Sequence, residues 1–94
     1  MRLLIAEDDS VTRLNLGAAV ERFGHEATAV PDGSKAWKAF KAGQYSVVIS
    51  DWDMPVMDGV ELCRRIRERP SDHYVYFILV ATRGGRHRYG SGRG

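Results

Sequence analysis

Strand-like and helix-like segments alternate along this chain, and the alternation constrains the fold more than any other feature. Apolar runs at residues 3–6, 26–30, 45–50 and 74–80 are separated by segments in which apolar residues recur with helical spacing. Such alternation favours βαβ units joined into a parallel sheet. A length of 94 residues allows one small domain, so we expect a single α/β fold.

Three helices are predicted between the strands. The first begins at Asp9 or Ser10 and ends at Gly24, which suits a helix terminus. The second covers about residues 34–42, and the third follows Asp58, an N-cap with Glu61 three residues later. The positions predicted to be buried are Leu16, Ala19, Val20, Phe23, Ala36, Trp37, Phe40, Leu62, Cys63 and Ile66.

Acidic residues follow two of the apolar runs. Glu7 and Asp8 come directly after the first run, and Asp51 comes directly after the third. Ligands bind beyond the carboxyl ends of parallel strands, so with the first and third strands adjacent these carboxylates converge. Crowded carboxylates repel one another and need a cation, and oxygen ligands favour Mg²⁺. With a cation bound, an aspartate can act as a nucleophile toward phosphorus. The plainer alternative is that these carboxylates only cap helices.

Two segments resemble the receiver domain of two-component response regulators. Residues 3–9 resemble the first strand and acidic pair of that family, and residues 48–55 with Asp58-Gly59 resemble its phosphorylation segment. The resemblance covers residues 1–82 and implies a flavodoxin-like three-layer sandwich with sheet order 2-1-3-4. Residues 83–94, rich in glycine and arginine, are predicted to form a tail or linker.

The resemblance also implies roles for individual residues. Asp51 is implied to be the phosphoacceptor, which receives its phosphoryl group from a histidine kinase or a phosphotransfer protein. Asp8 is implied to bind Mg²⁺ directly and Glu7 to act nearby through water, while Asp53 contributes its backbone carbonyl. A module of this kind receives a signal and is not expected to be an enzyme.

The chain departs from the family pattern after its fourth strand. The family places a hydroxyl residue at the end of that strand, whereas this chain has Ala81 at the expected position and Thr82 one residue later. Thr82 can supply the switch hydroxyl only if the strand end shifts by one residue. The family's fourth helix, fifth strand and lysine have no counterpart here, so we expect impaired phosphotransfer. An open fourth-strand edge also predicts a homodimer or a domain-swapped oligomer.

Two alternatives to the receiver function stay open. The first is a non-signalling fragment, natural or engineered, that keeps half of the site and self-associates. The second and weaker one is a phosphohydrolase of the haloacid dehalogenase type, because residues 51–53 match the Asp-x-Asp core of that superfamily. That superfamily usually carries the motif on its first strand, whereas here it follows the third run.

Charge and composition limit the remaining function classes. The net charge is +2, but residues 83–94 contain four arginines and no acid, so the rest of the chain is acidic. Nucleic-acid binding is therefore not expected. No apolar run is long enough to span a bilayer, and no secretory signal is recognised at the N-terminus. The single cysteine, Cys63, fits a reducing compartment, so a cytoplasmic location is expected.

Overall fold

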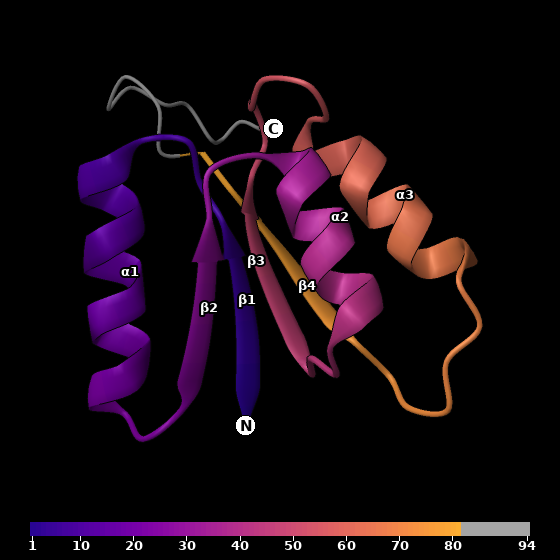
Figure 1. The fold of residues 1–94 in the computed structure, drawn as a ribbon, viewed down its shortest axis with the longest axis horizontal. Coiled ribbons are helices and arrows are strands. Elements are labelled where there is room, and N and C mark those ends of the chain that lie inside the picture. Colours follow the sequence, from indigo (N-terminus) through magenta and orange to yellow (C-terminus); the bar gives the residue numbers. More distant parts are fainter. Residues whose placement is uncertain (82–94) are drawn as a thin grey trace.

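Four parallel strands form one sheet in the order β2-β1-β3-β4 in the computed structural model, which describes residues 1–81 (Figure 1). Their bounds are β1 Arg2–Ala6, β2 Glu26–Val30, β3 Val47–Asp51 and β4 Tyr76–Val80. β1 pairs in parallel with β2 and β3, and β3 pairs in parallel with β4. This confirms the predicted α/β class and strand order.

Three helices connect the strands within the described residues: α1 Ser10–Arg22, α2 Gly33–Ala42 and α3 Gly59–Glu68. Each follows an aspartate, Asp9, Asp32 or Asp58, whose side chain accepts a hydrogen bond from the backbone N–H three residues ahead. Such caps satisfy backbone donors that have no partner inside the helix. α2 ends at Gly43, and after α1 the chain turns through Gly24 with φ of 87°. The predicted helix starts and stops are therefore confirmed.

The helices cover the two faces of the sheet and make three layers, as predicted. Side chains alternate across a strand, so Leu4 and Ala6 face one side while Leu3 and Ile5 face the other. α2 and α3 pack over the first of these faces (Figure 1). The main members of that core are Leu4, Ala6, Ala36, Phe40, Val48, Leu62 and Ile66. α1 packs over the other face, where it borders Ala27 and Ala29 of β2.

α1 is less deeply packed than its sequence predicts. None of its residues is fully buried, and Leu16 and Val20 are only partly covered. The prediction that Phe23 lies in the buried stripe is wrong, because its side chain is 78% exposed. Phe23 follows the last helical residue and adopts a non-helical backbone, so it leaves the face that the 3.6-residue repeat assigns to it. Cys63 of α3 is also only partly buried.

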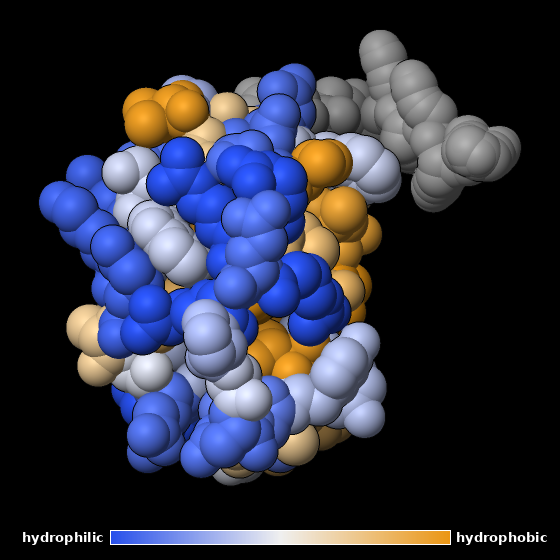
Figure 2. Space-filling model, turned by 90° about the vertical axis from the view of Figure 1, so that its right-hand side faces the viewer, coloured by the Kyte–Doolittle hydropathy of each residue, from blue (hydrophilic) through white to orange (hydrophobic). Residues whose placement is uncertain are grey.

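β4 begins two residues later than predicted and borders exposed apolar surface. Tyr74 and Val75 precede the strand, and Arg67 donates a hydrogen bond to the Val75 carbonyl oxygen at 2.6 Å. Figure 2 shows hydrophobic surface beside the charged surface of this side of the molecule. On β4 itself, Tyr76 is 63% exposed and Ile78 is 46% exposed.

Some sequence predictions fall outside the part of the chain that the structure describes. Thr82 and the tail predicted for residues 83–94 both lie there. Within residues 1–81, no helix has the length and apolar character needed to cross a bilayer.

Candidate functional site

Three carboxylates meet at the carboxyl edge of the sheet. One carboxylate oxygen from each of Glu7, Asp8 and Asp51 lies within 4.8 Å of the others. The sheet register explains the meeting, because Ala6 of β1 pairs with Ser50 of β3, and the next residue on each strand is acidic. The structure therefore brings together three of the four residues predicted for a metal site.

Burial makes this group unusual. Glu7 and Asp51 are each only 1% exposed, whereas Asp8 is partly exposed. Buried carboxylates close to one another are costly when ionised, because burial and like charge both oppose the charged form. A bound cation offsets both effects. The donors are all carboxylate oxygens, which suits a hard divalent ion such as Mg²⁺.

The loop between β1 and α1 is held by short hydrogen bonds. The Glu7 N–H donates to the Val30 carbonyl at 3.0 Å, and the Glu7 carboxylate accepts from the Asp9 N–H at 3.0 Å. Asp9 in turn caps α1, because its carboxylate accepts from the N–H and the hydroxyl of Thr12. Arg13 reaches back from α1 and donates to the Glu7 carbonyl oxygen at 2.8 Å.

The loop between β3 and α3 fixes the backbone around Asp51. The Ser50 hydroxyl donates to the Asp51 carbonyl at 2.9 Å, and the Trp52 N–H donates to the Val80 carbonyl of β4 at 3.1 Å. The Gly59 N–H donates to the Trp52 carbonyl at 3.0 Å, which ties the start of α3 to the end of β3. Asp51 is thus the last residue of a central strand, where it pairs with Val80 of β4 and its carbonyl is held by the Ser50 hydroxyl.

The other predicted residues lie apart from this cluster. The Asp53 carboxylate is not one of the three grouped carboxylates, and the residue is exposed. Asp9 and Asp58 cap helices, as predicted from the sequence. Sequence reasoning missed Arg13. Its signal was a basic residue near the start of a helix that directly follows the acidic loop, residues 7–9. Helical side chains lean toward the N-terminus of their helix, so such a residue can reach back to the loop.

Comparison with known proteins places this chain in a family. The family model described as the response regulator receiver domain matches residues 3–87. The transcriptional regulatory protein CseB of Streptomyces avermitilis is 44% identical over 81 residues, which cover 86% of this chain and 33% of the regulator. A chemotaxis protein CheY homolog of Campylobacter jejuni is 33% identical over 88 residues, 92% of this chain and 68% of that protein. The chain thus spans about a third of the Streptomyces regulator.

Solved structures agree with this placement. The structure of the histidine kinase ThkA in complex with the response regulator protein TrrA matches with a TM-score of 0.79 and 30% identity. The match covers 96% of this chain and 73% of the chain in that structure. Receiver domains are signalling modules with a flavodoxin-like fold, and the fold and acidic edge described above are of that kind. This chain belongs to the response regulator receiver domain family.

Proposed function

We propose that Asp51 accepts a phosphoryl group from a phosphohistidine on a histidine kinase or a phosphotransfer protein. The observation that carries the proposal is the buried Asp51 carboxylate, which lies with Glu7 and Asp8 at the carboxyl edge of the sheet. The similar solved structure that contains a histidine kinase supports this class of partner. The module is then a switch that is modified and reset rather than an enzyme, and the haloacid dehalogenase alternative is not needed.

The proposed transfer is a single displacement at phosphorus. An oxygen of the Asp51 carboxylate forms a bond to phosphorus while the bond from phosphorus to the histidine nitrogen breaks. The histidine ring keeps the electron pair of the broken bond, and the product is an acyl phosphate on Asp51. The Ser50 hydroxyl holds the Asp51 carbonyl and the Gly59 N–H holds the next carbonyl, that of Trp52, so the backbone that carries the attacking carboxylate is fixed.

Mg²⁺ is the proposed cofactor of this site. Asp8 and Asp51 would hold it with their carboxylates and Asp53 with its backbone carbonyl, while Glu7 would act nearby through water. When bound, a divalent ion neutralises charge on the phosphoryl oxygens. Repulsion between three grouped carboxylates and an incoming phosphoryl group supports the proposal that a cation takes part in the transfer.

The kinase partner is proposed to dock on α1. Val11 is 64% exposed and Leu14 is 72% exposed, and both line an open groove of about 470 Å³ between α1 and β2. Ala27 and Ala29 form the β2 side of this groove. The groove begins at Ser10, directly after the loop that carries Glu7 and Asp8, so a helix packed there can present a phosphohistidine to Asp51. An exposed apolar surface of this kind is typical of an interaction site.

Two further expectations remain proposals. Thr82 is the proposed switch hydroxyl, and it directly follows Ala81, the last residue that the structure describes. A cytoplasmic location is proposed because a single unpaired cysteine, Cys63, suits a reducing compartment.

We further propose that β4 mediates pairing with a second copy of the chain. Among the described residues β4 pairs only with β3, so it forms one edge of the sheet. Tyr76 and Ile78 on this edge are exposed and apolar or aromatic. Exposed edge strands of this character favour pairing with another chain. A two-fold symmetric contact would bury the same strand from both copies.

Phosphorylation and Mg²⁺ binding can be tested separately on the full chain. The protein is incubated with Mg²⁺ and a small acyl phosphate, and its intact mass is measured. We expect one added phosphoryl group, at low yield because Ala81 stands where the family has a hydroxyl residue, and Asp51→Asn should abolish it. In parallel, Mg²⁺ is titrated while the fluorescence of Trp52, the 50% exposed neighbour of Asp51, is followed. Asp8→Asn should remove the response.

Asp72→Asn is the matched control, since Asp72 is fully exposed in the loop before β4, at the opposite end of the strand. It should retain both activities. Mass gain that persists in Asp51→Asn would contradict the proposed acceptor, and an unchanged titration in Asp8→Asn would contradict the proposed metal site.

A further inference from the structure

We propose that Arg13 is a positioning residue that holds the acidic loop, residues 7–9, in the conformation that binds a cation. The inference rests on the proposed function, because it concerns the same group of carboxylates. It adds a basic residue of α1 to a site otherwise built from acidic residues of two strand ends. Arg13 would act through the backbone of Glu7 and not by touching the metal ion or the phosphoryl group.

Arg13 contacts the loop on both sides of Asp8. Its guanidinium Nη1 donates to the Glu7 carbonyl oxygen at 2.8 Å, and its backbone N–H donates to the Asp9 carbonyl oxygen at 2.9 Å. Asp8 lies between these two anchored residues. The Arg13 side chain therefore fixes the peptide group before Asp8, while the Glu7 carboxylate, which accepts from the Asp9 N–H, holds the peptide group after it. Together these contacts limit how far the Asp8 carboxylate can move.

The Glu7 carbonyl lies just beyond the part of β1 that is paired with neighbouring strands. The register of β1 with β2 and with β3 ends at Ala6, so the Glu7 carbonyl is beyond the last paired residue. The Arg13 side chain is partly buried and reaches this carbonyl from the second turn of α1. Arginine suits this contact, because its side chain is long and its guanidinium is planar and always charged.

Two possible roles of Arg13 predict opposite effects on Mg²⁺ binding. If Arg13 mattered only as a positive charge near three carboxylates, it would repel a divalent cation, and its removal would tighten Mg²⁺ binding. If Arg13 positions the loop, removal of its side chain makes the position of the Asp8 carboxylate less fixed, and Mg²⁺ binding weakens. The sign of the change therefore separates positioning from simple electrostatics.

The test compares the Mg²⁺ dissociation constants of variants of the 94-residue chain by calorimetry. Arg13→Gln removes the charge and shortens the donor, and we expect about a 10-fold weaker affinity, the lower end of the usual effect of residues that orient metal ligands. Arg22→Gln is the matched control, because it removes the same charge from the last turn of the same helix. Its affinity should stay at the wild-type value or become slightly tighter.

Arg13→Met gives a second route if Arg13→Gln does not fold, since it keeps a long apolar stem beside α1. Repeating the titrations at high salt screens the charge effect and should leave the loss in the Arg13 variants in place. Affinity equal to or tighter than the wild type in a folded Arg13 variant would overturn the inference. Absence of Mg²⁺ binding in the wild type would instead overturn the proposed function, so the two failures are distinguishable.

Discussion

Gly59 allows α3 to begin directly against the strand that ends in Asp51. A methyl group at this position would collide with the Asp51 carbonyl oxygen and would lie 2.6 Å from Cδ2 of Leu79. Gly17, in the middle of α1, is the opposite case, because a methyl group there would meet nothing within 4 Å. The same substitution therefore probes crowding at one position and helix propensity at the other.

We predict opposite effects for alanine at these two glycines. Gly59→Ala should lower the free energy of unfolding by about 1–3 kcal/mol, because the backbone of Asp51 has to move. Gly17→Ala should raise it by about 1 kcal/mol, because alanine favours the helix. Urea denaturation measures both. A Gly59→Ala protein as stable as the wild type would show that the two backbones can separate without cost.

Val56 is strained, and the strain can be tested. Its φ is 73°, the left-handed region that a β-branched residue rarely adopts, and its side chain is 85% exposed. Val56→Gly should raise the free energy of unfolding by about 0.5–1 kcal/mol, since relief of the backbone strain exceeds the added entropy of glycine. Val60→Gly, on α3, is the control and should lower it. Destabilisation by both changes would contradict the assigned strain.

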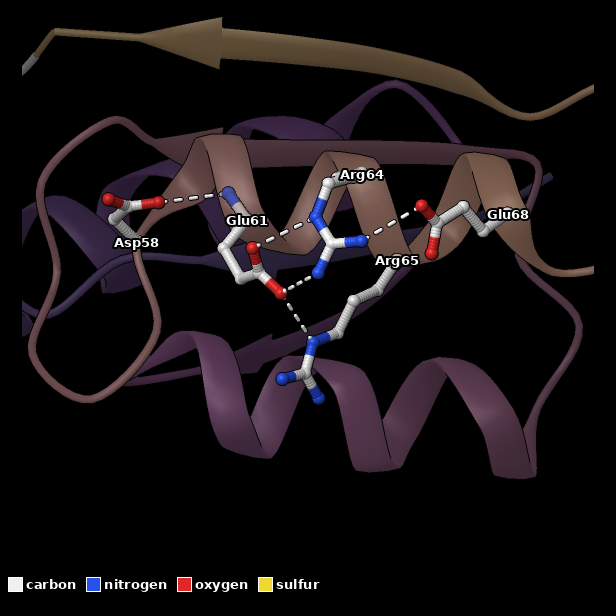
Figure 3. A network of polar contacts seen from close by, with 5 residues as sticks. All are labelled: Asp58, Glu61, Arg64, Arg65 and Glu68. Carbon is white, nitrogen blue, oxygen red and sulfur yellow. Dashed lines mark hydrogen bonds and ion pairs between the residues drawn. The ribbon is translucent and has the colours of Figure 1, made fainter.

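At the scale of the elements, α3 carries a network of charged side chains on its exposed surface (Figure 3). The Glu61 carboxylate accepts hydrogen bonds from Arg64 and from Arg65, and Arg64 also reaches Glu68 at 2.8 Å. Figure 3 shows Arg65 extending from α3 toward α2. These pairs lie three and four residues apart, the spacing at which helical side chains meet. The network therefore supports α3 locally.

The network predicts a pH dependence of stability. The hydrogen bond from Arg64, followed by that from Arg65, lowers the pKa of Glu61 to about 2, from an ordinary value near 4.5. Because the folded pKa is the lower one, the stabilisation is complete above about pH 4.5 and is lost as the pH falls toward 2. Glu61→Gln should flatten the stability curve in that window, while Glu21→Gln on α1 should leave its slope unchanged. Acid unfolding followed by circular dichroism measures both, and parallel curves for wild type and Glu61→Gln would contradict the coupling.

At the scale of the whole molecule, the two faces of the sheet are covered unequally at β4. Phe77 packs against the core beneath α2 and α3, whereas Ile78, on the opposite face of the same strand, is 46% exposed. α1 lies over β1 and β2 and leaves this part of the sheet accessible among the described residues (Figure 1). The exposed face and the strand edge together form the surface proposed for pairing of two copies.

Self-association through β4 predicts a specific effect of charge. Ile78→Lys should shift the protein to a monomer at concentrations where the wild type associates, because a lysine on the edge opposes pairing. Val60→Lys is the matched control, since Val60 is 50% exposed on α3, and it should associate as the wild type does. Sedimentation velocity over a concentration series measures all three proteins. A wild type that stays monomeric throughout would rule out the proposed contact.

The sequence by itself determined the elements and the residues that end them. Asp9 and Asp58 could be recognised as caps because a cap depends on hydrogen bonds to residues only three positions away. The acids that follow β1 and β3 could be recognised as a candidate site because the end of each apolar run is visible in the sequence. The strand order was predicted with the help of the family resemblance, because which strands become neighbours depends on contacts far apart in the chain.

Only the tertiary structure decided how the site is assembled. The register of β1 against β3 sets the close approach of Glu7, Asp8 and Asp51, and this approach buries Glu7 almost completely while Asp8 stays partly exposed. The contact between Arg13 and the Glu7 carbonyl depends on how α1 packs against the sheet, and no local sequence pattern specifies that packing. Hydrogen bonds within a turn depend on residues that are neighbours in the sequence, whereas burial and the approach of side chains depend on how distant segments pack together.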